Sequence, residues 1–382
     1  MEPLYGGGAL DSLLTTVATS LGVPGMPVPG AHSLVPAAAQ RPARRAVVVL
    51  VDGLGYELLR TRSGHAPFLR SLLPSAARIT AGFPSTTATS MATFGTGEAP
   101  GVHGMVGYEV LIPEADRLLN ELSWEDGPVP EVWQPVETVF QRAESAGVAV
   151  TRVGPAYFDG SGLTRAALRG GRFAAAESLE ARVDTTLAAL RAAPHALVYL
   201  YWGDVDKVGH VHGCSSWEWG EEVASVDAAL RRLVASVPPD TAVHVTADHG
   251  MVDVPHALRV DIAHDPTLAA GIRHLTAEFR APHVYCEPGA VEDVHATWTA
   301  VLGERATVLR REEAVAAGWF GPVRPENLPR IGDLVVAMHD TFAVVDSRTA
   351  RPELLALHGL HGSLTEAEMA VPWFVVPARI ES

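Results

Sequence analysis

Residues 196–210 read Ala-Leu-Val-Tyr-Leu-Tyr-Trp-Gly-Asp-Val-Asp-Lys-Val-Gly-His. The first seven are all apolar or aromatic, which predicts a strand that is buried on both faces of a parallel sheet. Asp206 and His210 follow four positions apart, so a helical turn would place both side chains on the same side. A carboxylate and an imidazole just beyond a strand end suit a divalent metal site, although a surface salt link is the simpler alternative.

Two further strand-like runs lead into metal-ligand residue types. Residues 46–51 are Val-rich and precede Asp52, and residues 242–247 precede Asp248 and His249. Helical patterns separate these runs, which is typical of βαβ units around a mostly parallel sheet. We therefore predict an α/β fold, a three-layer α/β/α sandwich, whose parallel strands bring these residues to one edge. Taken alone, an aspartate at the end of a strand such as Asp52 is more often a turn or helix-cap residue.

The alternating pattern changes after residue 256. Residues 257–330 mix short strand-like and helical patterns, and we predict that they form a small inserted α+β cap. The core would then comprise residues 1–256 and 331–382, and a chain of 382 residues is long enough for two such units. Residues 334–339 and 341–345 resemble a hairpin that returns the chain to the core.

Composition excludes several classes of function. The chain has 44 acidic against 29 basic side chains and a formal net charge of −15, which argues against binding a nucleic acid polymer. A bound metal could still reverse the local field for a small anionic substrate. The longest apolar runs are strand-sized, so we expect no membrane span. Cys214 and Cys286 form no disulfide framework, and we expect a cytoplasmic protein, with no indication of its oligomeric state.

A hydroxyl-rich run precedes another helical pattern. Residues 83–90 read Phe-Pro-Ser-Thr-Thr-Ala-Thr-Ser. One hydroxyl could simply cap the helix, but a threonine there could also be a nucleophile, because free amide groups at a helix N-terminus stabilise anions. Late in the chain, residues 359–362 read Gly-Leu-His-Gly, and a lone His361 would ordinarily be structural.

The order of these pieces is more informative than any one of them. Along the chain come Asp52, a threonine after a proline, Asp206-x-x-x-His210, Asp248-His249 and Gly-x-His361-Gly. This order resembles the alkaline phosphatase superfamily, most closely its nucleotide pyrophosphatase/phosphodiesterase branch, from about residue 46 to residue 376. The resemblance implies two divalent metal ions, zinc in that family, and a threonine that is transiently phosphorylated.

The resemblance also assigns the ligands. It implies one metal ion held by Asp206, His210 and His361, and a second held by Asp52, Asp248 and His249. His358 is the alternative to His361, and His212 is the alternative to His210. Carboxylate and imidazole ligands equally suit manganese or iron.

The family's spacing indicates the nucleophile. It places the nucleophile three residues after a proline and nine before a Thr-Gly pair, and both Pro84 and Thr96 point to Thr87. Thr87 would also be a ligand of both metals. Thr86 is the alternative if the spacing differs by one residue, and Ser90 offers a hydroxyl that could donate to a phosphoryl oxygen.

The resemblance therefore implies a metal-dependent hydrolase of phosphate diesters or pyrophosphates. Its substrate would be a small phosphate ester, such as a nucleotide. A phosphomonoesterase or phosphonate hydrolase of the same superfamily is the first alternative, and an inactive binding protein on the same fold is the second. Arg152, Arg165 and Arg169 are candidates for binding a phosphate monoester, and residues 157–162 for lining the leaving-group pocket.

Overall fold

A seven-stranded sheet lies at the centre of the molecule. The computed structural model describes residues 1–27, 30 and 33–379, and within them the strand order of this sheet is β2-β17-β8-β1-β7-β5-β6. All neighbours are parallel except β17, which is antiparallel to β2 and β8. The strands are β1 (Arg45–Val51), β2 (Ala77–Thr80), β5 (Ala149–Gly154), β6 (Arg172–Ala175), β7 (Ala196–Trp202), β8 (Thr241–Thr246) and β17 (Ala370–Val376). The predicted mostly parallel sheet is confirmed.

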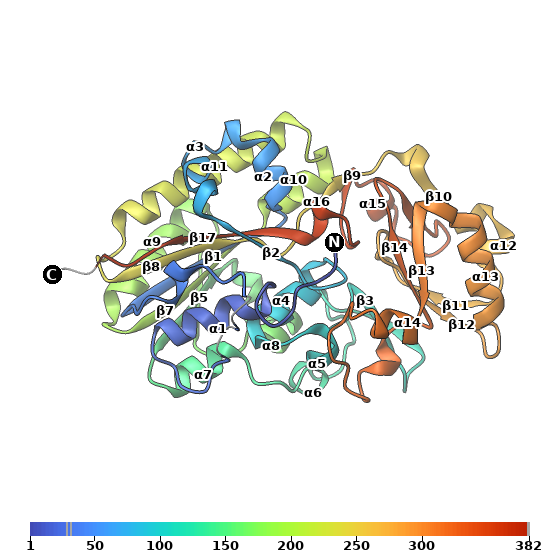
Figure 1. The fold of residues 1–382 in the computed structure, drawn as a ribbon, viewed down its shortest axis with the longest axis horizontal. Helices are drawn as coiled ribbons and strands as arrows, with labels where there is room; N and C mark the ends of the chain where they lie inside the picture. Colours follow the sequence, from blue (N-terminus) through green and yellow to red (C-terminus); the bar gives the residue numbers. More distant parts are fainter. Residues whose placement is uncertain (28–29, 31–32, 380–382) are drawn as a thin grey trace.

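Helices cover both faces of this sheet, so the molecule has the predicted three layers (Figure 1). One face carries α2 (Tyr56–Thr61), α3 (Pro67–Leu72), α9 (Leu179–Ala192), α10 (Asp204–His212) and α11 (Trp217–Ser236). The other carries α1 (Asp11–Ser20), α4 (Thr87–Thr96), α7 (Val139–Ser145) and α8 (Gly162–Ala167). Shorter helices are α5 (Pro100–His103), α6 (Pro130–Trp133), α15 (Pro352–Leu355) and α16 (Glu366–Met369). None of the described helices combines the length and apolarity needed to cross a membrane.

The centre of the sheet explains the apolar runs of the sequence. Residues 46–51 of β1 are each at most 2% exposed, because β7 and β8 flank the strand and helices cover both faces. Val47 stands in register with Val198 and Val243, so three valines meet across adjacent strands. Burying one such side chain stabilises the fold by about 1.5–3 kcal/mol. The strand is therefore a rigid base for the residues at its carboxyl end.

A second lobe lies beside one end of the sheet, shown in orange in Figure 1. Its antiparallel sheet has the order β11-β12-β14-β13, and its own apolar core surrounds the fully buried Trp298. Its elements are β11 (Ile272–Leu275), α12 (Pro266–Ala269), β12 (His283–Cys286), α13 (Val291–Leu302), β13 (Ala306–Arg310), α14 (Arg311–Ala316) and β14 (Leu334–Met338). The lobe thus takes a strand from beyond residue 330.

Three two-stranded sheets complete the fold of the described residues. They pair β3 (Glu109–Ile112) with β4 (Arg117–Asn120), β9 (Val252–Asp253) with β16 (Gly359–Leu360), and β10 (Arg259–Asp261) with β15 (Ala343–Val345). The predicted hairpin of residues 334–345 is wrong: β14 pairs with β12 and β13, while β15 pairs in parallel with β10. Both strands pair with strands that are distant in the sequence and pack against their apolar side chains. Closeness of β14 and β15 along the chain therefore did not determine the pairing.

Candidate active site

Three adjacent strands bring three carboxylates to one edge of the central sheet. Strand β1 lies between β8 and β7, and all three are parallel, so their carboxyl ends coincide. Asp52 directly follows β1, Asp248 follows β8, and Asp206 lies in the first turn of α10 after β7. Gly53 allows the approach: its φ is 72°, and a Cβ there would lie 2.9 Å from the Cα of Asp206.

The histidines come from more distant parts of the chain. His249 follows Asp248 at the end of β8, and His361 follows β16. Strand β16 pairs with β9, which begins three residues after His249, so this small sheet carries His361 back to the cluster. The rings of His249 and His361 stack with centroids 3.7 Å apart. His210 lies one helical turn after Asp206 in α10.

The donor atoms of these side chains converge. Nε2 of His210 lies 3.3 Å from Oδ2 of Asp206, and Nε2 of His361 lies 3.8 Å from Oδ1 of Asp206. Nε2 of His249 lies 3.5 Å from a carboxylate oxygen of Asp52 and 3.5 Å from one of Asp248. At these distances the two donor atoms of each pair could both contact a small ion placed between them.

Backbone carbonyls fix the tautomers of all three histidines. Nδ1 of His210 lies 2.7 Å from the carbonyl of Gly359, that of His249 lies 3.0 Å from the carbonyl of Gly250, and that of His361 lies 2.9 Å from the carbonyl of Ser85. A carbonyl only accepts, so each Nδ1 donates, and in the neutral form of each ring Nε2 is the nitrogen whose lone pair faces the cluster. This arrangement is the usual support for a metal-binding histidine.

Each of the three carboxylates also has one oxygen without a hydrogen-bond partner among the described residues. Oδ1 of Asp52, Oδ1 of Asp206 and Oδ2 of Asp248 are buried and have no hydrogen-bond partner within the described ranges. Burial raises the pKa of Asp52 well above its usual range, and the nearby Asp248 and Asp206 raise it further. Burial likewise raises the pKa of Asp248 and lowers that of His361. A divalent cation would pair these oxygens and lone pairs, so the residues fit a metal centre.

Two groups of donors could each hold one ion. Asp52, Asp248 and His249 form one group, as predicted for the second metal, with donor atoms within 4.8 Å of one another. Asp206 and His361 form the other, but the third member there is His249. His210 was predicted for that place and reaches the group through its contact with Asp206. Which histidine completes this set stays a prediction.

Thr87 lies at the mouth of the cluster, as the first residue of α4. Its Oγ1 is 3.2 Å from Nε2 of His249, and since that nitrogen carries a lone pair, the hydroxyl donates. The first amide groups of a helix have no intrahelical partner and attract anions. Thr87 therefore stands between the metal-ligand cluster and an anion-stabilising helix end.

The alternative residues that the sequence offered for the nucleophile and for the histidine ligands have other environments. Thr86 is buried before the helix starts, His358 is exposed, and His212 faces Glu218 at 3.8 Å. The Oγ of Ser90 is fully buried without a partner among the described residues, and Ser90 does not line the pocket beside Thr87.

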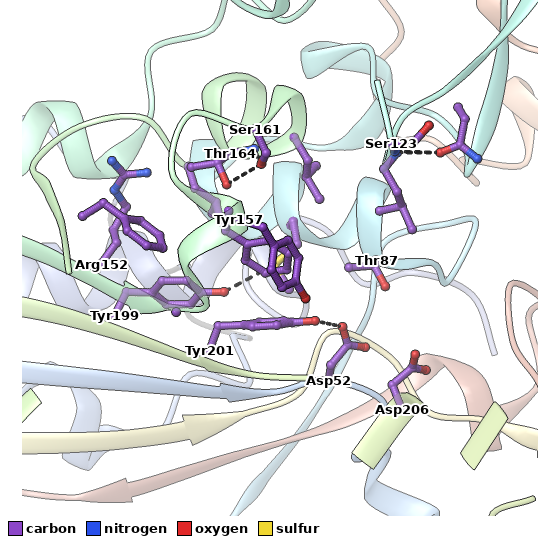
Figure 2. Close-up of a pocket in the computed structure, with 18 of the residues that line it drawn as sticks. Asp52, Thr87, Ser123, Arg152, Tyr157, Ser161, Thr164, Tyr199, Tyr201 and Asp206 are labelled. Atoms are coloured by element: carbon purple, nitrogen blue, oxygen red, sulfur yellow. Dashed lines mark hydrogen bonds between the residues drawn. The ribbon is translucent and has the colours of Figure 1, made fainter. Parts of the chain in front are cut away.

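A cavity of about 520 Å³ opens beside Thr87, and its size is typical of small-molecule sites (Figure 2). The loop after β5 lines it with Tyr157 and Phe158, as predicted for that loop. Most of the other lining residues were missed: Met91, Tyr108, Asn120, Phe173, Tyr199 and Tyr201. In the sequence, Tyr199 and Tyr201 look like ordinary residues of a buried strand. The Tyr201 hydroxyl donates to Oδ2 of Asp52 over 2.6 Å and so connects the pocket to the cluster.

The three candidate arginines have different environments. Arg165 pairs with Glu131 at the surface, and Arg169 donates to the carbonyls of Arg165, Ala166 and Val136. Arg152 lines the pocket. In Figure 2 it lies on the opposite side of the pocket from Asp52 and Asp206, so it does not bind a phosphoryl group at the cluster.

Comparisons with known proteins agree with this geometry. The family model described as type I phosphodiesterase / nucleotide pyrophosphatase matches residues 46–364. The structure is similar to that of murine ectonucleotide pyrophosphatase / phosphodiesterase 5, with a TM-score of 0.69, 18% identity, and coverage of 86% of this chain and 87% of that one. An inactive threonine-to-alanine variant of the murine protein in complex with AMP is also similar, with a TM-score of 0.70, 18% identity and the same coverage.

A second kind of enzyme shares the fold. Phosphonoacetate hydrolase from Sinorhizobium meliloti 1021, in complex with phosphonoformate, is similar with a TM-score of 0.66 and 20% identity, covering 87% of this chain and 90% of that one. A search of curated proteins found no match.

Proposed function

The chain belongs to the type I phosphodiesterase / nucleotide pyrophosphatase family, whose members are metal-dependent hydrolases of phosphodiesters and pyrophosphates, and from this premise we propose that it acts through a phosphothreonine intermediate on Thr87. The observation that carries the proposal is the convergence, beside the Thr87 hydroxyl, of the histidine Nε2 atoms and of three carboxylate oxygens that have no hydrogen-bond partner within the described part of the chain. An inactive binding protein would have no reason to keep so costly a cluster.

The residues that would hold two divalent ions are Asp52, Asp206, His210, Asp248, His249 and His361, and zinc is the ion we propose. When bound, such ions lower the pKa of an alcohol or water and neutralise negative charge on a phosphoryl group. Thr87 would lose its proton to solvent and attack phosphorus in line with the leaving oxygen. The bond from phosphorus to that oxygen would break, and the leaving group would depart and take up a proton. Water would then hydrolyse the phosphothreonine, which still carries the second substituent of a diester. The free amides at the start of α4 would hold a phosphoryl oxygen.

The substrate proposed is a small phosphate diester or pyrophosphate, such as a nucleotide. The murine relative's variant binds AMP, and an inactive threonine-to-alanine change in that protein is of the same kind as the test proposed here. The cavity beside Thr87, with its aromatic lining, supports an organic substituent of about this size.

The test compares Thr87→Ala with Thr86→Ala. Turnover of bis(p-nitrophenyl) phosphate should be lost in Thr87→Ala, while its metal content, measured by mass spectrometry, stays near that of the parent. Thr86→Ala should retain turnover, because Thr86 precedes the helix, is buried and does not line the pocket beside Thr87. Acid quench should trap a p-nitrophenyl phosphoryl group on the peptide that contains Thr87, because only one of the two p-nitrophenolates has left at that stage.

A panel of ester classes and a chelator complete the experiment. The panel contains the diester, p-nitrophenyl phosphate and phosphonoacetate, each with and without chelator. Full activity of Thr87→Ala would exclude Thr87 as the nucleophile. A preference for phosphonoacetate over the two phosphate esters would assign the chain to phosphonate hydrolysis. If no substrate is turned over in a chelator-sensitive way, the chain is a binding protein.

A further inference from the structure

The pocket beside Thr87 runs along one strand from the metal-ligand cluster to a buried arginine. Tyr199 and Tyr201 alternate along β7 and therefore point to the same face of the sheet. Tyr201 contacts Asp52 at one end, and Tyr199 stands in register with Arg152 of the neighbouring β5. Figure 2 shows the two tyrosines between the carboxylates and Arg152. Phe173 of β6 is next in register and closes this end of the pocket.

Arg152 is buried without a partner. It is 9% exposed, and its Nε and Nη1 have no hydrogen-bond partner in the part of the chain that the structure describes. The other buried arginines are all satisfied: Arg280 by Glu368, Arg182 by three backbone carbonyls and Arg330 by two. Burying an unpaired guanidinium is unfavourable, so its presence in a pocket wall requires a reason.

Contacts within the described structure compensate the charge of Arg152 only in part. The guanidinium lies 5.8 Å from the centroid of the Phe173 ring, which gives a weak cation–π attraction. Among acidic side chains, the charge of Asp159 raises the pKa of Arg152 most, against the lowering by burial. Asp159 is exposed on the loop after β5, however, and forms no ion pair with Arg152 in the described structure. The positive charge therefore remains uncompensated inside a largely apolar pocket, where a Coulomb attraction is stronger than in water.

We propose that Arg152 binds an anionic group, a carboxylate or a phosphate, at the far end of the substrate substituent that occupies this pocket. The proposal rests on the proposed function and narrows its substrate class to esters that carry a second, terminal negative charge. The reacting phosphoryl group would lie at Thr87, the aromatic side chains would pack along the substituent, and the guanidinium would fix its end through two parallel hydrogen bonds.

The test uses diesters that share one p-nitrophenyl group and differ in the second substituent. That substituent is an alkyl chain of graded length ending in a carboxylate, a phosphate or a neutral carboxamide. At the length that spans the pocket, kcat/KM for an anionic chain should exceed that for the carboxamide chain by at least about tenfold. The carboxylate and phosphate arms show which anion is preferred.

Substitutions assign the preference to Arg152. In Arg152→Met the ratio of kcat/KM for anionic over carboxamide chains should fall to about one, and Arg152→Lys should keep part of it. The matched control is Arg165→Met, which removes a surface arginine and should leave the ratio unchanged. Arg152→Met should melt no lower than the parent, since it removes an unpaired buried charge.

Two outcomes would overturn the proposal: no anionic preference at any chain length, or a preference that survives in Arg152→Met. Failure of the proposed function is distinguishable, because it would abolish turnover of every diester, including the carboxamide. In that case the Kd values of ω-carboxyalkyl and ω-carboxamidoalkyl phosphates for the parent and Arg152→Met, measured by calorimetry, decide the question. Equal affinities in the parent would then refute the role of Arg152.

Discussion

A buried ion pair connects the second lobe to the loops that carry two of the histidines. Arg280, between β11 and β12, and Glu368 of α16 are both fully buried, with Nε–Oε1 at 2.9 Å and Nη2–Oε2 at 2.6 Å. Oε1 of Glu368 also accepts the amide of Ser363, and its backbone carbonyl accepts the amide of Gly250. Those two residues lie next to the loops of His361 and His249. The pair therefore supports the candidate metal-binding residues as well as the lobe.

Arg280→Met leaves the Glu368 carboxylate buried and uncompensated. Removing one partner of such a pair costs about 3–5 kcal/mol, so we expect the free energy of unfolding in urea to fall by this amount. Metal content should fall too, because the loops of His249 and His361 lose a common anchor. The matched control is Arg165→Met, whose two-point contact with Glu131 has the same form but is 40–46% exposed, and it should cost at most about 1 kcal/mol.

A double variant separates the charge from the packing. Arg280→Met combined with Glu368→Met removes both charges, and it should recover much of the lost stability, because apolar replacement of a whole buried pair is often neutral. If Arg280→Met costs no more than Arg165→Met, burial does not control the strength of this pair. If the double variant is as unstable as the single one, the loss comes from packing and not from the unpaired carboxylate.

Two further predictions concern buried polar groups. Tyr201→Phe removes the donor to Asp52 and should weaken metal binding by at least about tenfold in a chelator competition; unchanged affinity would contradict the supporting role of this hydroxyl. Burial raises the pKa of Glu121 to about 8 from 4.5, so the folded protein keeps a proton that the unfolded chain releases. As the pH rises from 4.5 to about 8, the free energy of unfolding should therefore fall by up to about 1.4 kcal/mol per pH unit. Glu121→Gln should flatten this slope, whereas Glu125→Gln on the surface should not; equal slopes for both variants would refute the assignment.

The sequence predicted those site residues whose position follows from local structure. Asp52 and Asp248 each follow a strand with an uninterrupted apolar run, and two adjacent parallel strands must deliver such residues to the same edge. Asp206 and His210 share a helical turn, which fixes their proximity. His361 was different. Its place depends on the pairing of β16 with β9, more than 100 residues away, so only the resemblance of its flanking glycines indicated it.

Most of the pocket could not be predicted from the sequence, because it too depends on tertiary packing. Tyr199, Tyr201 and Phe173 have the composition of core strands, and only the packing of α4 and the loop after β5 leaves space above them. Arg152 was one of three arginines in a single stretch, and nothing local separates it from Arg165. Its register beside Tyr199 and the lack of a hydrogen-bond partner for its Nε and Nη1 in the described structure distinguish it. Such features arise from tertiary packing, and a pattern along the chain does not encode them.

The charges at the site indicate the order in which metal ions and substrate bind. The chain has a formal net charge of −15, and Asp52 and Asp206 line the very pocket that a phosphate ester must enter. Without cations these carboxylates repel the substrate. Burial of their Oδ1 atoms, which have no hydrogen-bond partner among the described residues, is also unfavourable. Divalent ions remove both problems at once, so metal binding has to precede binding of the anionic substrate. Arg152 then acts where the ions cannot, at the opposite end of the pocket, and the two positive centres together favour a substrate that is negatively charged at both ends.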